Sequence, residues 1–266
     1  MEVRHMPESV ARIREIVHAF NPDIHIEQIT FLPQGVSNEN YRVDTPNNTW
    51  LVKLYAKPLP NNAIAAQRAL AALGACPEPV HVDDAHRCAI FAYLPGAMPG
   101  EFDHQQAVQK LVQIHTFTRS GSKLDLHAEL AGYEKEVFYR PYAEQLEQVV
   151  TQTHAKQQDW CFCHNDLIKE NIISYRQQWC CIDFEYAQVG DRYFDLAMLT
   201  LSFKLAEQQQ QLLFEHYFNE MNLEGDWQKF IAMQKLVAAL NYFWYQRQGV
   251  HQRVDDAKAQ LDALLG

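Results

Sequence analysis

The sequence of 266 residues predicts an α+β fold with a strand-rich first third and a mainly helical remainder. Two observations support this prediction. Apolar residues alternate with polar ones in several short runs before Leu94, and they recur at helical spacing after about Gln105. Since 47% of the residues are hydrophobic, a chain of this length can bury a sizeable core. We expect an N-terminal lobe over residues 1–94 and a helical C-terminal lobe over residues 95–266.

In the first lobe, the patterns predict an amphipathic helix, three strands, an alanine-rich helix and two further strands. Turn-forming segments separate the first three strands, and Gly74 and Pro77 end the second helix. The expected ranges are, in chain order, Glu8–Phe20, Ile24–Leu32, Asn40–Val43, Thr49–Tyr55, Asn62–Leu73, Pro79–Val82 and Cys88–Leu94.

In the second lobe, the helical pattern covers Glu134–Tyr142, the run to Val150 and Phe194–Leu265. Two short apolar strands interrupt it, Trp160–Cys163 and Trp179–Ile182. They are close enough in the sequence that we expect them to pair as a hairpin. That pairing would bring together the polar residues that follow each strand.

Charge and composition exclude several classes of protein. With 23 Lys and Arg against 33 Asp and Glu, the net charge is −10, which argues against nucleic-acid binding. The first twenty residues carry charges throughout, and no stretch is apolar enough to span a bilayer, so we expect a cytoplasmic protein without membrane insertion. The six cysteines lack the spacing of a zinc site, and we expect buried, reduced thiols.

The segment from His164 to Glu185 carries the chemistry. Phosphoryl transfer needs a carboxylate near the attacking hydroxyl and oxygen ligands that hold Mg²⁺ against the phosphates of a nucleotide. Asp166 fits the first role, and Asn171 and Asp183 fit the second. A lone histidine is more often structural than a ligand, so His164 is expected to support the loop.

These residues also resemble a known family. The pattern His164-x-Asp166-x-x-x-x-Asn171, followed by Asp183-Phe-Glu, resembles the signature of aminoglycoside phosphotransferases and choline kinases, which share the protein-kinase-like two-lobed fold. The resemblance implies a kinase that uses ATP and Mg²⁺ to phosphorylate a small-molecule alcohol, with ATP in the cleft between the lobes. It also implies that Asp195 braces the catalytic loop.

Upstream, the resemblance implies nucleotide-binding residues. The segment that contains Ser37 and Asn38 resembles the turn that covers the phosphates, and Lys53 resembles the strand lysine that pairs with them. The residues Ala92, Tyr93 and Leu94 resemble the hinge that binds adenine through backbone groups. The family's usual helix glutamate is missing, because no acidic residue lies between Asp44 and Glu78. Its possible substitutes as the partner of Lys53 are Asn61, Asn62, Gln67 and Glu39.

The run from Tyr242 to Gly249 resembles bacterial thiamine kinases, and choline kinases carry an aromatic segment in this region that packs around a quaternary ammonium. The resemblance implies a cationic acceptor such as thiamine, choline or ethanolamine. The candidate acceptor-binding residues are Glu185, Asp191, Tyr242, Trp244 and Tyr245. Alternatively, the aromatic residues belong to the core and the carboxylates anchor the loop.

Other functions remain open at this stage. An aminoglycoside or sugar kinase would use the same phosphoryl-transfer residues, and a nucleotide-binding pseudokinase would explain the missing glutamate. A metal-dependent hydrolase would need more histidine ligands than the central segment provides. The sequence leaves the identity of the acceptor and the oligomeric state undetermined.

Overall fold

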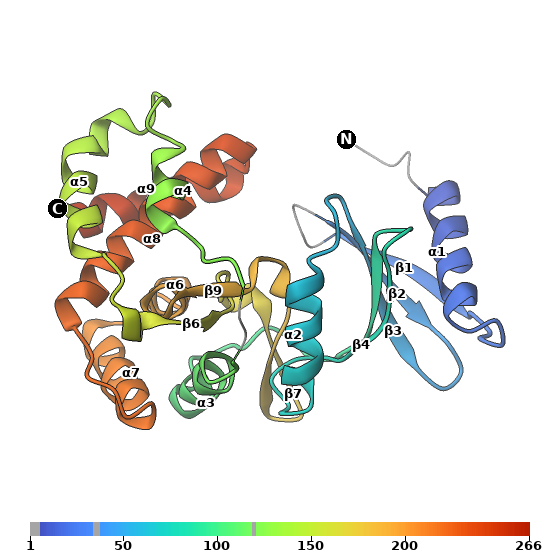
Figure 1. Ribbon diagram of the computed structural model, residues 1–266. Helices are drawn as coiled ribbons and strands as arrows, with labels where there is room; N and C mark the ends of the chain where they lie inside the picture. Colours follow the sequence, from blue (N-terminus) through green and yellow to red (C-terminus); the bar gives the residue numbers. More distant parts are fainter. Residues whose placement is uncertain (1–5, 34–37, 119–120) are drawn as a thin grey trace. The chain divides into compact units, whose positions relative to one another are not determined.

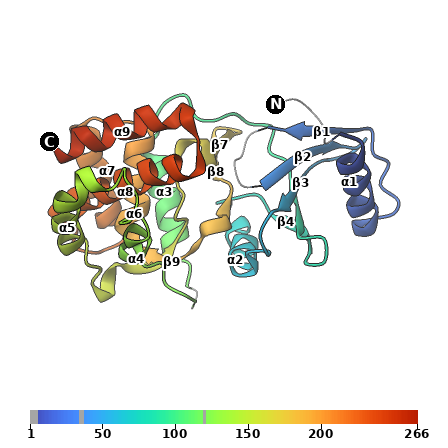
Figure 2. The same cartoon turned by 90° about the horizontal axis from the view of Figure 1, so that it is seen from above.

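The computed structural model describes residues 6–33, 38–118 and 121–266. The chain divides into two compact units, Met1–Gly96 and Ala97–Gly266 (Figures 1 and 2). Among the described residues, no helix combines the length and the apolar character that a bilayer crossing requires.

The N-terminal unit is built on an antiparallel sheet of five strands in the order β1-β2-β3-β5-β4. Helix α1 precedes the sheet, and α2 lies between β3 and β4 in the chain. The elements are α1 (Met6–Phe20), β1 (Gln28–Leu32), β2 (Asn38–Asp44), β3 (Thr49–Tyr55), α2 (Asn61–Ala71), β4 (Pro79–Asp83) and β5 (Cys88–Ala92).

The two helices of this unit cover opposite faces of the sheet (Figure 1). On one face, Ile13 and Val17 of α1 pack with Val52 and other buried strand residues. On the other face, Ile64 of α2 packs with Tyr55 and with residues of β5. Successive side chains of a strand point to opposite faces, so Lys53, between Val52 and Leu54, shares the α2 face with Tyr55.

The C-terminal unit is mainly helical and contains two small antiparallel ribbons. Its helices are α3 (His104–His115), α4 (Leu126–Ala131), α5 (Ala143–Gln152), α6 (Arg192–Ser202), α7 (Glu207–Glu220), α8 (Trp227–Gln248) and α9 (His251–Leu265). Single 3₁₀ turns are η1 (Arg140–Tyr142), η2 (Gln157–Asp159), η3 (Lys169–Asn171) and η4 (Phe184–Tyr186). The strands are β6 (Trp160–Cys163), β7 (Ile172–Tyr175), β8 (Gln178–Cys181) and β9 (Gln188–Asp191).

Helix α6 forms the centre of this unit. Every side chain from Arg192 to Leu201 is buried, which is the pattern of a helix surrounded by protein. It contacts α3, α8, β6 and β9 (Figure 1). A five-stranded sheet in the N-terminal part and helices in the C-terminal part confirm the predicted α+β fold class.

Two local predictions were wrong. The strand Trp160–Cys163 does not pair with Trp179–Ile182, because β6 pairs with β9 and β8 pairs with β7. The β7–β8 turn explains the difference: Arg176 and Gln177 have φ values of 50° and 62°, as a two-residue type I′ hairpin requires. The helix expected over Glu134–Tyr142 is instead a series of turns that ends in η1, where Pro141 removes a helical hydrogen-bond donor.

Candidate active site

Strand β6 leads directly into the loop that carries Asp166. The side-chain amide of Asn171 donates hydrogen bonds to the main-chain oxygen of Asp166, at 2.9 Å, and to its Oδ2 atom, at 2.8 Å. The main-chain N–H of Asn171 also donates to the oxygen of Ile168, at 3.0 Å. These bonds close the loop on itself and fix the carboxylate of Asp166 relative to Asn171.

The β7–β8 hairpin then delivers Asp183 to the same place. Ile172 lies opposite Cys181 in the hairpin, and the N–H of Ile182 donates to the main-chain oxygen of Asn171, at 2.8 Å. Asp183 follows immediately, with a left-handed φ of 63°, a conformation that is costly for a residue other than glycine. The structure therefore brings Asp166, Asn171 and Asp183 together through a hairpin other than the predicted one.

The electrostatics of this site favour a cation. Burial raises the pKa of Asp166 to about 8, and the charges of Asp183 and Glu185 add to this effect. The hydrogen bond with Asn171 acts in the opposite direction. Carboxylates that lie close together destabilise each other's charged forms. A positive charge among them would relieve this repulsion, so the arrangement suits a divalent cation, a cationic ligand or both.

Asp195, on α6, holds the start of the loop. Its two carboxylate oxygens accept hydrogen bonds from the main-chain N–H groups of His164, at 2.7 Å, and Asn165, at 2.8 Å. His115 of α3 lies 3.2 Å from the same carboxylate through Nε2. Burial alone would raise the pKa of Asp195, but the hydrogen bond and the charge of His115, with the backbone hydrogen bond from His164, lower it overall. The loop is thus anchored to two helices by one carboxylate.

His164 is buried and makes structural contacts. Its Nε2 atom lies 2.9 Å from the main-chain oxygen of Ile182, and its ring lies 4.4 Å from the ring of Phe184. Burial lowers the pKa of His164, which favours the neutral imidazole. These contacts join the loop after β6 to the segment that carries Asp183.

Asn165 has a structural role that the sequence pattern did not indicate. It adopts a left-handed φ of 60°, and its side-chain amide donates to the main-chain oxygen of Tyr186, at 3.0 Å. A Cβ atom added at Gly190 would lie 2.6 Å from the Oδ1 atom of Asn165. Asparagine tolerates the left-handed region better than most residues, and that preference was the available signal.

Asp191 lies in a buried ion-pair cluster. Lys229 of α8 reaches Asp191 at 2.5 Å and Asp159 at 2.7 Å, and all three side chains are at least 95% buried. Asp191 also caps α6 by accepting a hydrogen bond from the N–H of Tyr193, at 3.0 Å. Its pKa is nevertheless raised, because burial outweighs the attraction of Lys229. The geometry accounts for Asp191 as an anchor of α6.

The aromatic segment of α8 divides between core and surface. Tyr242 and Phe243 are buried among aromatic residues that include Phe138 and Tyr142. Trp244 and Tyr245 are half-buried and contact each other edge to face, with ring centroids 5.4 Å apart. The guanidinium of Arg253 lies 5.7 Å from the ring centroid of Tyr245 and donates to its hydroxyl, at 3.2 Å.

The candidate nucleotide residues lie in the N-terminal unit. Ser37 falls outside the described residues. The Oδ1 atom of Asn38 accepts a hydrogen bond from the N–H of Ala56, at 3.2 Å, which ties the start of β2 to the end of β3. Lys53 is 95% buried, and its ammonium lies 5.1 Å from the ring centroid of Tyr55.

The candidate hinge, Ala92 to Leu94, begins at the last residue of β5. The N–H of Ala92 donates to the oxygen of Glu78, at 3.3 Å, and the N–H of Tyr93 donates to the oxygen of Thr49, at 3.1 Å. Both donors are therefore engaged within the N-terminal unit.

Three of the candidate partners of Lys53 make other contacts. The Nε2 atom of Gln67 donates to the oxygen of Pro77, at 3.2 Å, and the amide of Asn61 donates to Asp84, at 3.2 Å. Glu39 accepts a hydrogen bond from the hydroxyl of Tyr41, at 2.8 Å. As expected from the sequence, α2 contains no acidic residue.

Solved structures with a similar fold include choline kinases and an aminoglycoside phosphotransferase. The choline kinase LicA from Streptococcus pneumoniae is 20% identical, with a TM-score of 0.76 over 96% of this chain and 99% of that chain. A choline/ethanolamine kinase family protein from Mesorhizobium loti is also 20% identical, with a TM-score of 0.73 over 96% and 92% of the two chains. The GDP and kanamycin complex of APH(2")-IIia is 16% identical, with a TM-score of 0.68 over 96% and 97%. These similarities establish the protein-kinase-like fold.

The family is established by sequence. The model of the phosphotransferase enzyme family matches residues 28–230, which is most of the chain. The chain therefore belongs to this family. Protein LicA of Haemophilus influenzae is 35% identical over 60 residues. These residues are 23% of this chain and 22% of that protein, so the match spans only about a fifth of the relative's length. The predicted resemblance to aminoglycoside phosphotransferases and choline kinases is confirmed.

Proposed function

We propose that this protein transfers the γ-phosphate of ATP to the hydroxyl group of a small cationic alcohol such as choline, ethanolamine or thiamine. The observation that carries the proposal is the placement of Asp166. It is half-buried, fixed by the amide of Asn171 and close to Asp183, all within a chain of the phosphotransferase enzyme family. The six free cysteines suit a reducing compartment, so we also propose a cytoplasmic location.

Asp166 acts as the general base in this proposal. A carboxylate that accepts a proton from the attacking hydroxyl must be held in position, and two hydrogen bonds from Asn171 supply that restraint. Asp195 acts as a positioning residue, because it fixes the backbone of the two residues that precede Asp166. His164 supports the loop through Ile182 and Phe184.

The donor set at the end of the β7–β8 hairpin fits Mg²⁺. The nitrogen of the Asn171 amide is committed to Asp166, which directs the amide oxygen away from that carboxylate. This oxygen and the carboxylate of Asp183 are the hard oxygen ligands that Mg²⁺ prefers. Bound there, Mg²⁺ would neutralise charge on the nucleotide phosphates.

The nucleotide is assigned to the N-terminal unit. Lys53 supplies a buried positive charge for the α- and β-phosphates, and the segment with Ser37 and Asn38 covers them. The hydrogen bonds of Ala92 and Tyr93 within the unit leave the N–H of Leu94 as the donor that we assign to adenine. A LicA structure in complex with AMP, 19% identical with a TM-score of 0.72, supports nucleotide binding.

A cationic acceptor is supported by the negative charge around Asp166. Glu185 contributes to this charge, and it is the carboxylate that we assign to the acceptor. Trp244 is the aromatic candidate, because Tyr242 is buried in the core and Tyr245 already contacts Arg253. We leave Asp191 out of the acceptor site, since it is paired with Lys229. A cation against an aromatic face gains about 0.5–2 kcal/mol.

The test is a panel assay with purified protein, ATP, Mg²⁺ and small alcohols, which measures both ADP release and the phosphorylated product. The panel contains choline, ethanolamine, thiamine, an uncharged analogue of choline, neutral sugars and aminoglycosides. We expect the alcohols with a fixed positive charge to give the highest kcat/KM. Phosphorylation of neutral sugars alone would contradict a cationic acceptor, and ATP binding without any acceptor would indicate a pseudokinase.

Variants of Asp166 test its role. Loss of a general base typically reduces the rate by roughly 10²–10⁴-fold, and Asp166→Ala should lower kcat by that factor while the affinity for ATP changes little. Asp166→Asn preserves the size of the side chain and guards against collapse of the loop. Asp255→Ala, at an exposed position of α9, is the matched control. A folded Asp166→Asn protein with wild-type turnover would remove Asp166 from catalysis.

A further inference from the structure

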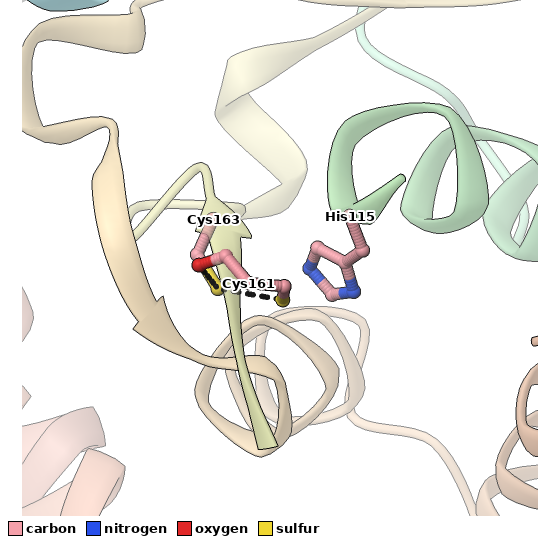
Figure 3. A group of neighbouring side chains, drawn as sticks. All are labelled: His115, Cys161 and Cys163. Atoms are coloured by element: carbon pink, nitrogen blue, oxygen red, sulfur yellow. Dashed lines mark hydrogen bonds between the residues drawn. The ribbon is translucent and has the colours of Figure 1, made fainter. Parts of the chain in front are cut away.

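Three side chains on β6 and α3 form a group next to the proposed catalytic loop, and the proposed reaction does not use them. Cys161 and Cys163 of β6 and His115 of α3 offer ligand atoms that all lie within 4.8 Å of one another. Figure 3 shows the sulfur of Cys161 between Cys163 and the imidazole ring. The two cysteines are two positions apart in a strand and share one face, which places their sulfur atoms 3.5 Å apart.

The two thiols differ in their surroundings. Cys161 is half-buried, whereas Cys163 is fully buried. The hydrogen bond from Cys163 lowers the pKa of Cys161 against the effect of burial, and the positive charges of His115 and Arg192 add to this lowering. Burial raises the pKa of Cys163. One thiol of the pair is therefore disposed to ionise, and its neighbour keeps its proton.

The contacts of His115 argue against a metal centre. Its Nδ1 atom lies 2.6 Å from the hydroxyl of Tyr217, and its Nε2 atom lies 3.2 Å from Asp195. A metal ion would have to displace one of these partners. The guanidinium of Arg192, which is bonded to the same Tyr217 hydroxyl at 2.9 Å, would also repel a cation. A partly exposed thiolate near positive charges and beside a second thiol has instead the features of an oxidisable cysteine.

We propose that Cys161 and Cys163 form a modification site at which hydrogen peroxide oxidises the pair to a disulfide. The thiolate of Cys161 attacks one oxygen of the peroxide, the O–O bond breaks, and the departing hydroxide takes up a proton to form water. Cys161 is then a sulfenic acid. The sulfur of Cys163 attacks that of Cys161, the S–O bond breaks, and the proton of Cys163 leaves with the hydroxide as a second water. The pair loses two electrons, which reduce the peroxide.

The position of the pair couples this reaction to the proposed active site. Cys163 directly precedes His164, whose N–H is held by Asp195, and β6 is paired with β9 along its whole length. A disulfide requires Cβ atoms about 3.5–4.5 Å apart, so joining two cysteines of one extended strand has to bend that strand. This consequence rests on the proposed function: we expect the oxidised protein to lose phosphoryl transfer and to regain it after reduction.

The chemical test needs no kinase activity. Reduced protein is treated with hydrogen peroxide, remaining thiols are alkylated, and intact mass and peptide mapping locate the oxidation. We expect the loss of two hydrogens per chain, mapped to Cys161 and Cys163. Cys163→Ala should stop at a sulfenic acid on Cys161 that dimedone traps, and Cys161→Ser should abolish the reaction. Cys180→Ser is the control, because Cys180 is also half-buried but burial raises its pKa.

Three outcomes would contradict the proposed site or its coupling to the loop. If oxidation maps to another pair of cysteines, or if Cys161→Ser consumes peroxide at the wild-type rate, the pair is not the modification site. If the disulfide forms but turnover with the best acceptor stays unchanged, its coupling to the loop is wrong. A chain that forms the disulfide but phosphorylates no acceptor before oxidation would overturn the proposed function and leave the modification site supported.

Discussion

Replacement of Asp195 with asparagine would change the acceptor that holds the catalytic loop, with almost no change in side-chain size. In the native protein, one oxygen of Asp195 accepts from the N–H of Asn165, and the other accepts from the N–H of His164 and lies near His115. An amide offers one oxygen and one NH₂ group. In either orientation, a backbone N–H group of the loop would face an amide donor.

The magnitude follows from these bonds. A hydrogen bond to a charged group contributes about 1.5–3 kcal/mol, and a buried donor without a partner costs about 1–3 kcal/mol. Because Asp195 is fully buried, water cannot replace the lost acceptor without local opening. We therefore expect Asp195→Asn to lower the free energy of unfolding by roughly 2–5 kcal/mol. Turnover should also fall, because Asp166 follows the released segment.

Urea unfolding and steady-state kinetics check this prediction together. The control is Asp255→Asn, at an exposed position of α9, which should unfold at the wild-type midpoint. A positioning role predicts a lower kcat with little change in the KM for ATP. A variant of Asp195 with the wild-type urea midpoint and the wild-type kcat would refute the reasoning.

Three further predictions follow from the same unit. Lys229→Met leaves two buried carboxylates without their partner and should lower the free energy of unfolding by about 3–5 kcal/mol at neutral pH. The loss of unfolding free energy in Lys229→Met should become smaller as the pH falls. The pKa of Asp191 is already raised in the folded state, and protonation removes the buried charge. Urea unfolding at neutral and acidic pH measures this loss, and a loss that does not change with pH would contradict the prediction. Gly190→Ala places a Cβ atom 2.6 Å from Asn165 and should destabilise the protein by about 1–3 kcal/mol in thermal unfolding; unchanged stability would mean that Asn165 moves freely. Asp183→Asn should raise the Mg²⁺ concentration needed for half-maximal turnover, and an unchanged requirement would remove Asp183 from the metal site.

The strands of the N-terminal unit could be predicted because apolar residues alternate along them in the sequence. The expected strand Thr49–Tyr55 has the same bounds as β3, and the other expected elements differ from the observed ones by a few residues at their ends. The partner of β6 was not predictable in this way. Strand β9 reads Gln-Val-Gly-Asp, so a single apolar side chain marks it, and its pairing depends on residues that fold between the two strands.

In the proposed active site, the sequence also identifies some residues and not others. The sequence was enough to associate Asp166, Asn171 and Asp183, although the hairpin expected to join them was wrong. Asp166 and Asn171 lie between β6 and β7, and Asp183 follows β8. The anchors could not be derived from spacing. Lys229 lies 38 residues after its partner Asp191, and His115 lies 80 residues before Asp195. Sequence left two roles open for Asp191, and only the packing of α8 against α6 brings a buried ammonium to it.

The hydrogen bonds that Asp195 accepts from the catalytic loop also determine when the loop can become ordered during synthesis of the chain. The N–H of His164 is held by a carboxylate that lies 31 residues later, so the loop emerges from the ribosome before its anchor exists. Domains fold largely as units while the chain lengthens, and the buried helix α6 docks only when its surroundings are present. The segment around Asp166 therefore acquires its final geometry late, and an incomplete chain that ends before α6 carries the motif without the ordered site.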